Sequence, residues 1–204
     1  QSYSYILDTI CSPEERTKIL YMWKDDEHLL RRNEYIGNQY NDFLEEDDEF
    51  NFMKALIANY ILEGIYFYSG FSFFYNLGRN GKMPGTVQEI RYINRDENTH
   101  LWLFRSLIND LKKERADLFT EEHIKYYTAM LKEGVEQEIA WGKYAIGDNI
   151  SGLNGKMIED YIKYLGNLRA KGLGFGNLYE GYTEVPDSMK WVEAVSYTHL
   201  RAHE

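Results

Sequence analysis

The chain has little cysteine and little proline. Cys11 is the single cysteine, which excludes an intrachain disulfide and is consistent with a reducing compartment. The three prolines, Pro13, Pro84 and Pro186, each lie near an expected element boundary, so long helices can run without interruption. At 204 residues, and without a linker-like stretch, the chain is long enough for one domain with a sizeable core.

Basic residues are also in deficit. The chain has 23 Lys and Arg against 33 Asp and Glu, which gives a formal net charge of −10. This balance argues against a nucleic-acid partner or an anionic membrane surface. Much of the acidity lies in the run EEDDE at residues 45–49, which we expect to be a solvated connection between helices.

No N-terminal signal pattern is present, and the apolar stretch at residues 56–77 is a poor membrane span. It contains a central acid, two asparagines, two serines and repeated aromatic residues, and it lacks a basic flank on one side. A buried core helix explains the stretch better. We therefore expect no membrane association and, by default, a cytoplasmic protein.

Helix-start signals recur along the chain. Ser12 to Glu15 combines an N-cap, a proline at the first helical position and a capping-box glutamate, and Thr86 to Glu89 forms a second capping box. We expect an all-α fold with more than about 60% helix, roughly twice the globular average, and at most a short hairpin near Tyr179 to Thr183. The expected helices cover residues 13 to 42–44, 48 to the glycine-rich loop at 78–85, 86 to about 113, 120 to about 147, and 154 to 172–174.

Glu63 is the only formally charged residue between Leu56 and Leu77. An unpaired carboxylate in such a helix would lose several kcal/mol of hydration free energy. Glu63 should therefore be protonated, meet a cation or face a water-filled surface. For Glu63 taken alone, ordinary hydrogen bonding of a buried polar group is an alternative.

A second acid lies close to a histidine in the run RDENTH at residues 95–100. Glu-x-x-His on an inward helix face presents a carboxylate and an imidazole to one ion in four-helix-bundle di-metal proteins. A satisfied core histidine is the alternative for His100 alone. With Glu63 34 residues before Glu97, the pattern predicts half of a di-metal site, with the Glu63 carboxylate close to Glu97 or His100. On a helical period, Glu97 and His100 share a core-facing stripe with Ile93, Phe104 and Ile108.

Gly64 and Gly70 each cost roughly 1 kcal/mol in a helix interior. Close packing of the helix in an aromatic core is one explanation. A local distortion of the helix beside a metal site is the other, because widened turns often occur at functional sites. The sequence leaves both open.

Several segments carry a family resemblance. LEGIYFYSGFSFF and RYINRDENTHLWLF resemble the small, radical-generating subunit of class I ribonucleotide reductase, and the similarity continues through EQEIAWGKYAIGD to about Glu193. The resemblance implies a ferritin-like helical bundle and a dinuclear iron or manganese centre that reacts with oxygen or a reduced oxygen species. It also implies a homodimer and a large-subunit partner, on which the oxidant reaches a cysteine and ribonucleotides are reduced to deoxyribonucleotides.

The resemblance also implies roles for individual residues. Glu63, Glu97 and His100 match metal ligands, and Asp96 matches an aspartate that hydrogen-bonds a ligand histidine and belongs to the radical-transfer route. Without the resemblance, Asp96 would be interpreted as a surface acid paired with Lys or Arg. The family's apolar wall, which shields the radical-bearing residue, is matched by residues that would otherwise be plain core packing, namely Phe67, Phe71 and Ile93.

Part of the family's pattern is not found in this sequence. A dinuclear site of this type needs about six protein ligands from four helices. The first residues, QSYSYIL, resemble those just after the family's other Glu-x-x-His helix and its radical tyrosine, so we expect an incomplete bundle. None of the 18 tyrosines, Tyr3 and Tyr5 included, is assigned as the radical site. The fragment alone is expected to be inactive.

The other end also departs from the family. The small-subunit domain is expected to cover residues 1–193, and residues 194–204 are expected to be a non-native tail that resembles translated adapter sequence. His199 and His203 are spaced i, i+4, but we do not expect them to bind zinc.

Two alternatives to the reductase subunit remain open at this point. One is another ferritin-like di-metal carboxylate oxidase, and the other is a metal-free helical interaction module. If the chain forms the family's homodimer, the helix expected from Pro13 to Leu44 is a candidate for part of that interface.

Overall fold

A computed structural model describes the backbone of residues 2–197 and the side chains of residues 4–195. The side chain of Tyr3, and all of His199 and His203, therefore lie outside the described part. The structure is 80% helical, and no strand occurs in the described residues, which confirms the predicted all-α class. The α-helices are α1 (Ser2–Ile10), α2 (Pro13–Tyr21), α3 (Glu27–Glu45), α4 (Glu49–Gly64), α5 (Tyr68–Arg79), α6 (Pro84–Glu114), α7 (Glu121–Ile146), α8 (Gly155–Gly172) and α9 (Lys190–Tyr197).

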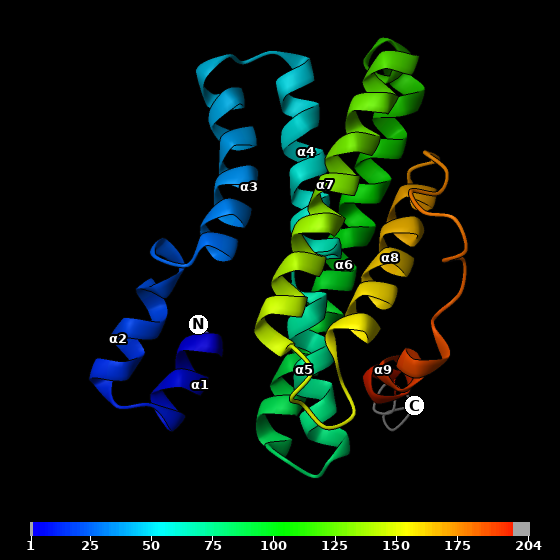
Figure 1. Cartoon of the computed structure of the whole chain (residues 1–204). Helices are drawn as coiled ribbons and strands as arrows, with labels where there is room; N and C mark the ends of the chain where they lie inside the picture. The colour runs from blue at the N-terminus through cyan, green and yellow to red at the C-terminus, as the bar shows by residue number, and fades with distance from the viewer. Residues whose placement is uncertain (1, 198–204) are drawn as a thin grey trace.

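The long helices form a bundle around α4. Figure 1 shows α4, α6, α7 and α8 running side by side, with α3 along one flank and α1 and α2 extending away from it. α4 packs against α3, α6 and α7, whereas α8 packs mainly along α7. Within the described residues, no helix is long and apolar enough to cross a membrane.

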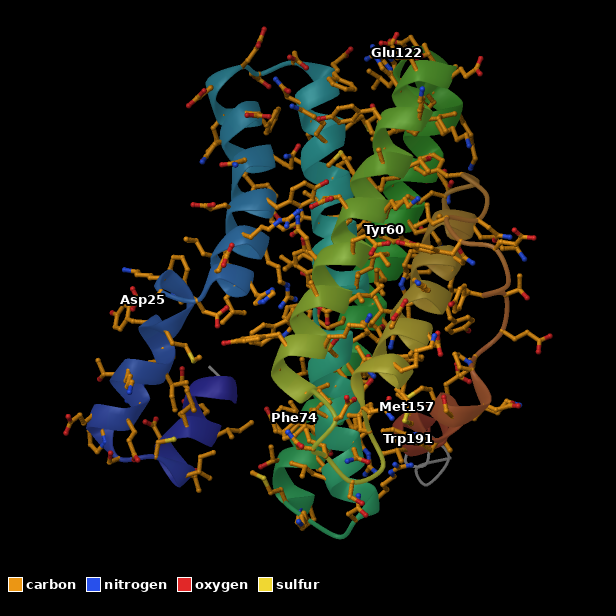
Figure 2. All side chains as sticks on the ribbon, in the orientation of Figure 1. Asp25, Tyr60, Phe74, Glu122, Met157 and Trp191 are labelled. Atoms are coloured by element: carbon orange, nitrogen blue, oxygen red, sulfur yellow. The ribbon has the colours of Figure 1, made fainter. Side chains whose placement is uncertain are left out.

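The core lies between these helices and is rich in aromatic rings. Tyr60, labelled in Figure 2, is 2% exposed, and its hydroxyl donates to Arg169 O on α8 at 3.4 Å. Burial of apolar side chains between α4 and α6, between α4 and α7, and between α7 and α8 stabilises the bundle. Fully buried members of this core include Met53, Ile57, Ile61, Tyr75, Tyr127, Leu131, Val135, Ile158 and Ile162.

Most predicted helix starts are confirmed by their caps. Ser12 forms the predicted capping box with Glu15, and the side chains of Asp48, Thr120 and Asn154 each accept a hydrogen bond from the first turn of the helix that follows.

The prediction of one helix from residue 13 to residues 42–44 is wrong, because the helix is broken at residues 22–26. A 3₁₀ turn, η1 (Met22–Lys24), follows α2, and Asp26 then caps α3 by accepting from Leu29 N at 3.0 Å. Asp26 is extended, with φ −93° and ψ 116°, so it starts a new helix and does not continue the old one. The apolar side chains around this break are exposed.

Two smaller expectations also differ from the structure. α6 begins at Pro84, two residues before the expected Thr86, because proline is favoured at the first helical position and Met83 adopts a left-handed φ of 48° before it. The allowed hairpin near Tyr179 to Thr183 does not form. Buried Asn167 of α8 instead donates to the carbonyls of Tyr179 and Tyr182, at 2.8 Å and 2.9 Å, and thereby holds the loop.

Gly134 provides a test of the α4 and α7 packing. A Cβ at Gly134 would approach Cγ2 of the fully buried Ile61 to 2.5 Å, so Gly134→Ala should lower the free energy of unfolding by about 1–3 kcal/mol. Gly37→Ala in α3 is the matched control, because nothing lies within 4 Å of its new Cβ, and it should raise stability by about 0.5–1 kcal/mol. Urea unfolding measures both. Equal stability of the two variants would contradict this packing.

Candidate metal centre

Glu63 is placed by the last turn of α4. The helix ends one residue after it, and residues 65–67 form a turn before α5 begins at Tyr68. The Tyr66 N–H donates to Ile61 O at 3.3 Å, an i to i−5 bond of the kind found in π-bulges. The single helix expected from residue 48 to the loop at 78 is therefore wrong, because it is interrupted directly after Glu63.

Gly64 allows α4 to approach its neighbours at this point. A Cβ there would lie 2.7 Å from Leu101 Cδ2 of α6 and 3.1 Å from Arg169 Nε of α8. Gly70 is exposed, and nothing lies within 4 Å of its Cβ position. Close packing thus explains Gly64. The other explanation, a local distortion of the helix, applies to the turn at residues 65–67, immediately after Gly64.

The three predicted ligand residues meet between α4 and α6. His100 Nδ1 lies 2.9 Å from Glu97 Oε2 and 3.4 Å from Glu63 Oε2, and one ligand atom of each residue lies within 4.8 Å of the others. Two ligands about 2.1 Å from one ion are about 3 to 3.5 Å apart, so this spacing suits a shared ion. Carboxylates and imidazole are ligands that suit manganese and iron. The predicted closeness of Glu63 to Glu97 and His100 is confirmed.

The three side chains differ in exposure. Glu97 and Glu63 are 11% and 17% exposed, whereas His100 is 51% exposed. The expectation that the motif points into a core is therefore right for Glu97 and wrong for His100. α6 packs against α4 and α5 on one side, and among the described residues its other side is open, so that Asp96 and Trp102 are exposed there as well.

Charge is concentrated at this cluster. Burial, together with the neighbouring Glu63 carboxylate, raises the pKa of Glu97 to about 7, although His100 acts in the opposite direction. The contact with Glu97 in turn raises the pKa of His100. A proton or a metal cation relieves the repulsion between two carboxylates in such a place. The donor set and its charge therefore fit a divalent cation.

Comparison with known proteins identifies the family. The family model described as "Ribonucleotide reductase, small chain" matches residues 1–186. The chain belongs to the ribonucleotide reductase small-chain family. Among its relatives, the ribonucleoside-diphosphate reductase subunit beta of Treponema pallidum is 64% identical over 98% of this chain and 57% of its own length. The corresponding subunit of Halalkalibacterium halodurans is 40% identical over 95% of this chain and 56% of its own.

A solved structure supports the same family. The ribonucleotide reductase R2 subunit from Clostridium botulinum superimposes with a TM-score of 0.90 at 50% sequence identity, covering 95% of this chain and 61% of that one. The small-chain family has the ferritin-like helical fold, as predicted. The chain spans less than two thirds of the length of each of these three relatives.

Asp96, the residue that matches the family's radical-transfer aspartate, is 59% exposed. Its carboxylate accepts from the adjacent Arg95 at 3.1 Å, and within the described residues it makes no hydrogen bond to His100. This is the arrangement expected of a surface acid. A role for Asp96 in radical transfer remains a proposal.

The three apolar residues matched to the family's shielding wall lie on α5, α6 and the turn before α5. Phe67 and Phe71 stack with ring centroids 6.0 Å apart, and Phe71 is 2% exposed. Phe71 also stacks on the fully buried Tyr75 at 6.5 Å. Ile93 and Phe67 are half-buried and pack against the same core. Packing alone accounts for all three, and the shielding role remains a proposal.

Sequence reasoning missed three charged residues that contact the break after Glu63, namely Arg32, Glu138 and Arg169. No pattern in the sequence marks them, because each lies in an amphipathic helix where a charge is ordinarily solvated.

Proposed function

We propose that this chain is part of the small subunit of ribonucleoside-diphosphate reductase. In this function a dinuclear metal centre generates the radical that a large subunit uses to convert ribonucleotides to deoxyribonucleotides for DNA synthesis. The observation that carries the proposal is the meeting of Glu63, Glu97 and His100 in a family member.

Glu63, Glu97 and His100 would hold one side of a dinuclear iron or manganese centre. When bound, the metal pair supplies the one-electron oxidant. The chain's own residues would bind the cations, shield the centre from water and connect it to the radical-transfer route. The two carboxylates supply negative charge for the cations, and Phe67, Phe71 and Ile93 exclude water. Asp96 would connect the centre to the radical-transfer route when its exposed face is covered.

The partners follow from the same family membership. The large subunit would receive the radical, and two small subunits would form a homodimer. Exposed apolar residues around the break between α2 and α3 support a protein contact there, namely Ile19, Leu20, Tyr21, Met22 and Trp23. A cytoplasmic location is consistent with the single cysteine.

The function is tested by assaying reduction of a ribonucleoside diphosphate with the full-length protein, a large subunit and either iron or manganese. Radical formation is followed by electron paramagnetic resonance. Absence of both signals with both metals would overturn the proposal.

The metal site itself can be tested in the 204-residue chain. We expect weak binding of Mn²⁺, and His100→Ala should weaken it at least about tenfold because the imidazole is lost from an already small ligand set. His123→Ala is the matched control. His123 packs on Phe50 at a ring distance of 4.8 Å, and Phe50 lies thirteen residues, or about 20 Å, from Glu63 along α4. Mn²⁺ affinity is measured by calorimetric titration. If both variants bind Mn²⁺ as tightly as the wild type does, the ion binds elsewhere.

A further inference from the structure

The break between α4 and α5 releases backbone groups that a continuous helix would pair. In such a helix the Ser69 N–H would donate to Ile65 O, and Tyr66 O would accept from the Gly70 N–H. Here Tyr68 N donates to Ile65 O instead, at 3.2 Å. A buried backbone group without a partner costs about 1–3 kcal/mol, so a break in the core needs other partners.

Side chains from two other helices supply these partners. Glu138 Oε1 of α7 accepts from the Ser69 N–H at 2.9 Å, and Arg32 Nη2 of α3 donates to Tyr66 O at 2.5 Å. The same two side chains form an ion pair, with Arg32 Nη2 2.6 Å from Glu138 Oε2. Glu138 is fully buried and Arg32 is 10% exposed. Arg32 and Glu138, called the clamp below, therefore hold the break from α3 and from α7.

A third side chain completes the arrangement from α8. Arg169 Nε donates to Gly64 O at 3.1 Å, and its Nη2 donates to the Tyr68 hydroxyl at 2.9 Å. The chain from Gly64 to Ser69 is thus held by side chains from α3, α7 and α8, each far from it in the sequence.

Stability alone does not account for the Arg32–Glu138 pair. Replacing a buried ion pair by apolar residues of similar volume is often neutral or stabilising. Burial raises the pKa of Glu138 to about 7 even though Arg32 lowers it, so burial disfavours the ionised carboxylate in the folded chain. Arg32 and Glu138 each provide a hydrogen-bond partner for one backbone group near the break after Glu63. Arg32 donates to Tyr66 O, and Glu138 accepts from the Ser69 N–H.

We infer that Arg32 and Glu138 are positioning residues, which fix the α4–α5 break and thereby hold the Glu63 carboxylate against His100 and Glu97. The inference rests on the proposed metal-binding role of Glu63. Glu63 and its two partners lie on different helices, so the end of α4 must be fixed for the three donors to meet. Residues that orient metal ligands typically affect metal affinity 10- to 100-fold when removed.

The test compares two double variants of the 204-residue chain. Arg32→Met with Glu138→Leu removes the clamp but keeps apolar volume, and Asp42→Leu with Lys54→Met is the control. Lys54 and Asp42 form an ion pair at 2.7 Å that also joins α4 to α3, with Lys54 10% exposed. Among the described residues, neither side chain forms a hydrogen bond or an ion pair with residues 64–69. We expect the clamp variant to fold with a lower thermal midpoint, because Tyr66 O and the Ser69 N–H lose their partners, and to bind Mn²⁺ at least tenfold more weakly. The control should bind within twofold of wild type.

Each outcome decides the matter. A folded clamp variant with wild-type Mn²⁺ affinity would overturn the inference. If the wild-type chain binds no Mn²⁺, the three donors do not hold an ion by themselves, and the inference is judged from a crystal structure of the clamp variant. There the distance from Glu63 Oε2 to His100 Nδ1, 3.4 Å in the wild type, should grow, and an unchanged distance would refute positioning. If the clamp variant does not fold, amide exchange in the wild type decides, since a Ser69 N–H that exchanges as fast as exposed Gly70 is not held by Glu138.

Discussion

The 204-residue chain alone should support no measurable reduction of ribonucleoside diphosphates when it is mixed with a large subunit and supplied with iron or manganese. Among the described residues, one group of three metal-ligating side chains is present, whereas a dinuclear centre of this type uses about six. Three donors leave two cations under-coordinated and open to water, on the side where His100 is half-exposed. We therefore expect weak metal binding and no oxygen-dependent radical signal in electron paramagnetic resonance.

The full-length protein is the control for this prediction. It should bind two metal ions per subunit, give the radical signal and support reduction under the same conditions. A stable dinuclear cluster in the 204-residue chain itself would contradict the expectation that three donors bind metal only weakly.

The starts of four helices could be predicted because each of these starts carries a local signal. Ser12, Asp48, Thr120 and Asn154 accept hydrogen bonds from the first turn of their helices, and such caps depend only on neighbouring residues. The two breaks were missed for different reasons. The break before α3 has a local signal in Asp26, which the surrounding acidic residues obscure.

The break after Glu63 has no such local signal. Its partners are Arg32, Glu138 and Arg169, which come from three other helices, so it depends on tertiary contacts that no helical period records. Gly64 marks the place, but glycine is consistent with close packing as well as with distortion.

The candidate metal site was accessible from the sequence because its residues conflict with their surroundings. Glu63 is an acid in an apolar helix, and Glu97 lies on the buried stripe of the next one. Such conflicts between local pattern and residue type are expected at functional sites. The half-exposure of His100 was not accessible, since the period gives the direction of a side chain and not whether another element covers it.

Glu97→Ala or His100→Ala in the full-length protein should abolish the radical signal and lower ribonucleotide reduction by more than about a hundredfold. Each change removes a direct ligand, so the loss should exceed the 10- to 100-fold typical of residues that only orient ligands. Asp110→Asn on the same helix is the control, because Asp110 is exposed and pairs with Lys113, three residues along the same helix, and its activity should match the wild type.

Glu97→Gln separates loss of activity from loss of the fold. The pKa of Glu97 is raised from 4.5 to about 7, so the folded metal-free protein holds this proton more tightly than the unfolded chain does. Ionisation of Glu97 therefore destabilises the metal-free fold, and the cost grows as the pH rises from about 4.5 through 7. In the metal-free protein at pH 8, Glu97→Gln should raise the free energy of unfolding by about 1 kcal/mol, which corresponds to a thermal midpoint about 2–4 °C higher. This gain in stability should vanish below pH 4.5. The same variant should be inactive, since an amide cannot balance the charge of the cations. A Glu97→Gln protein that is less stable than wild type at pH 8 would show that Glu97 serves the fold and not the metal.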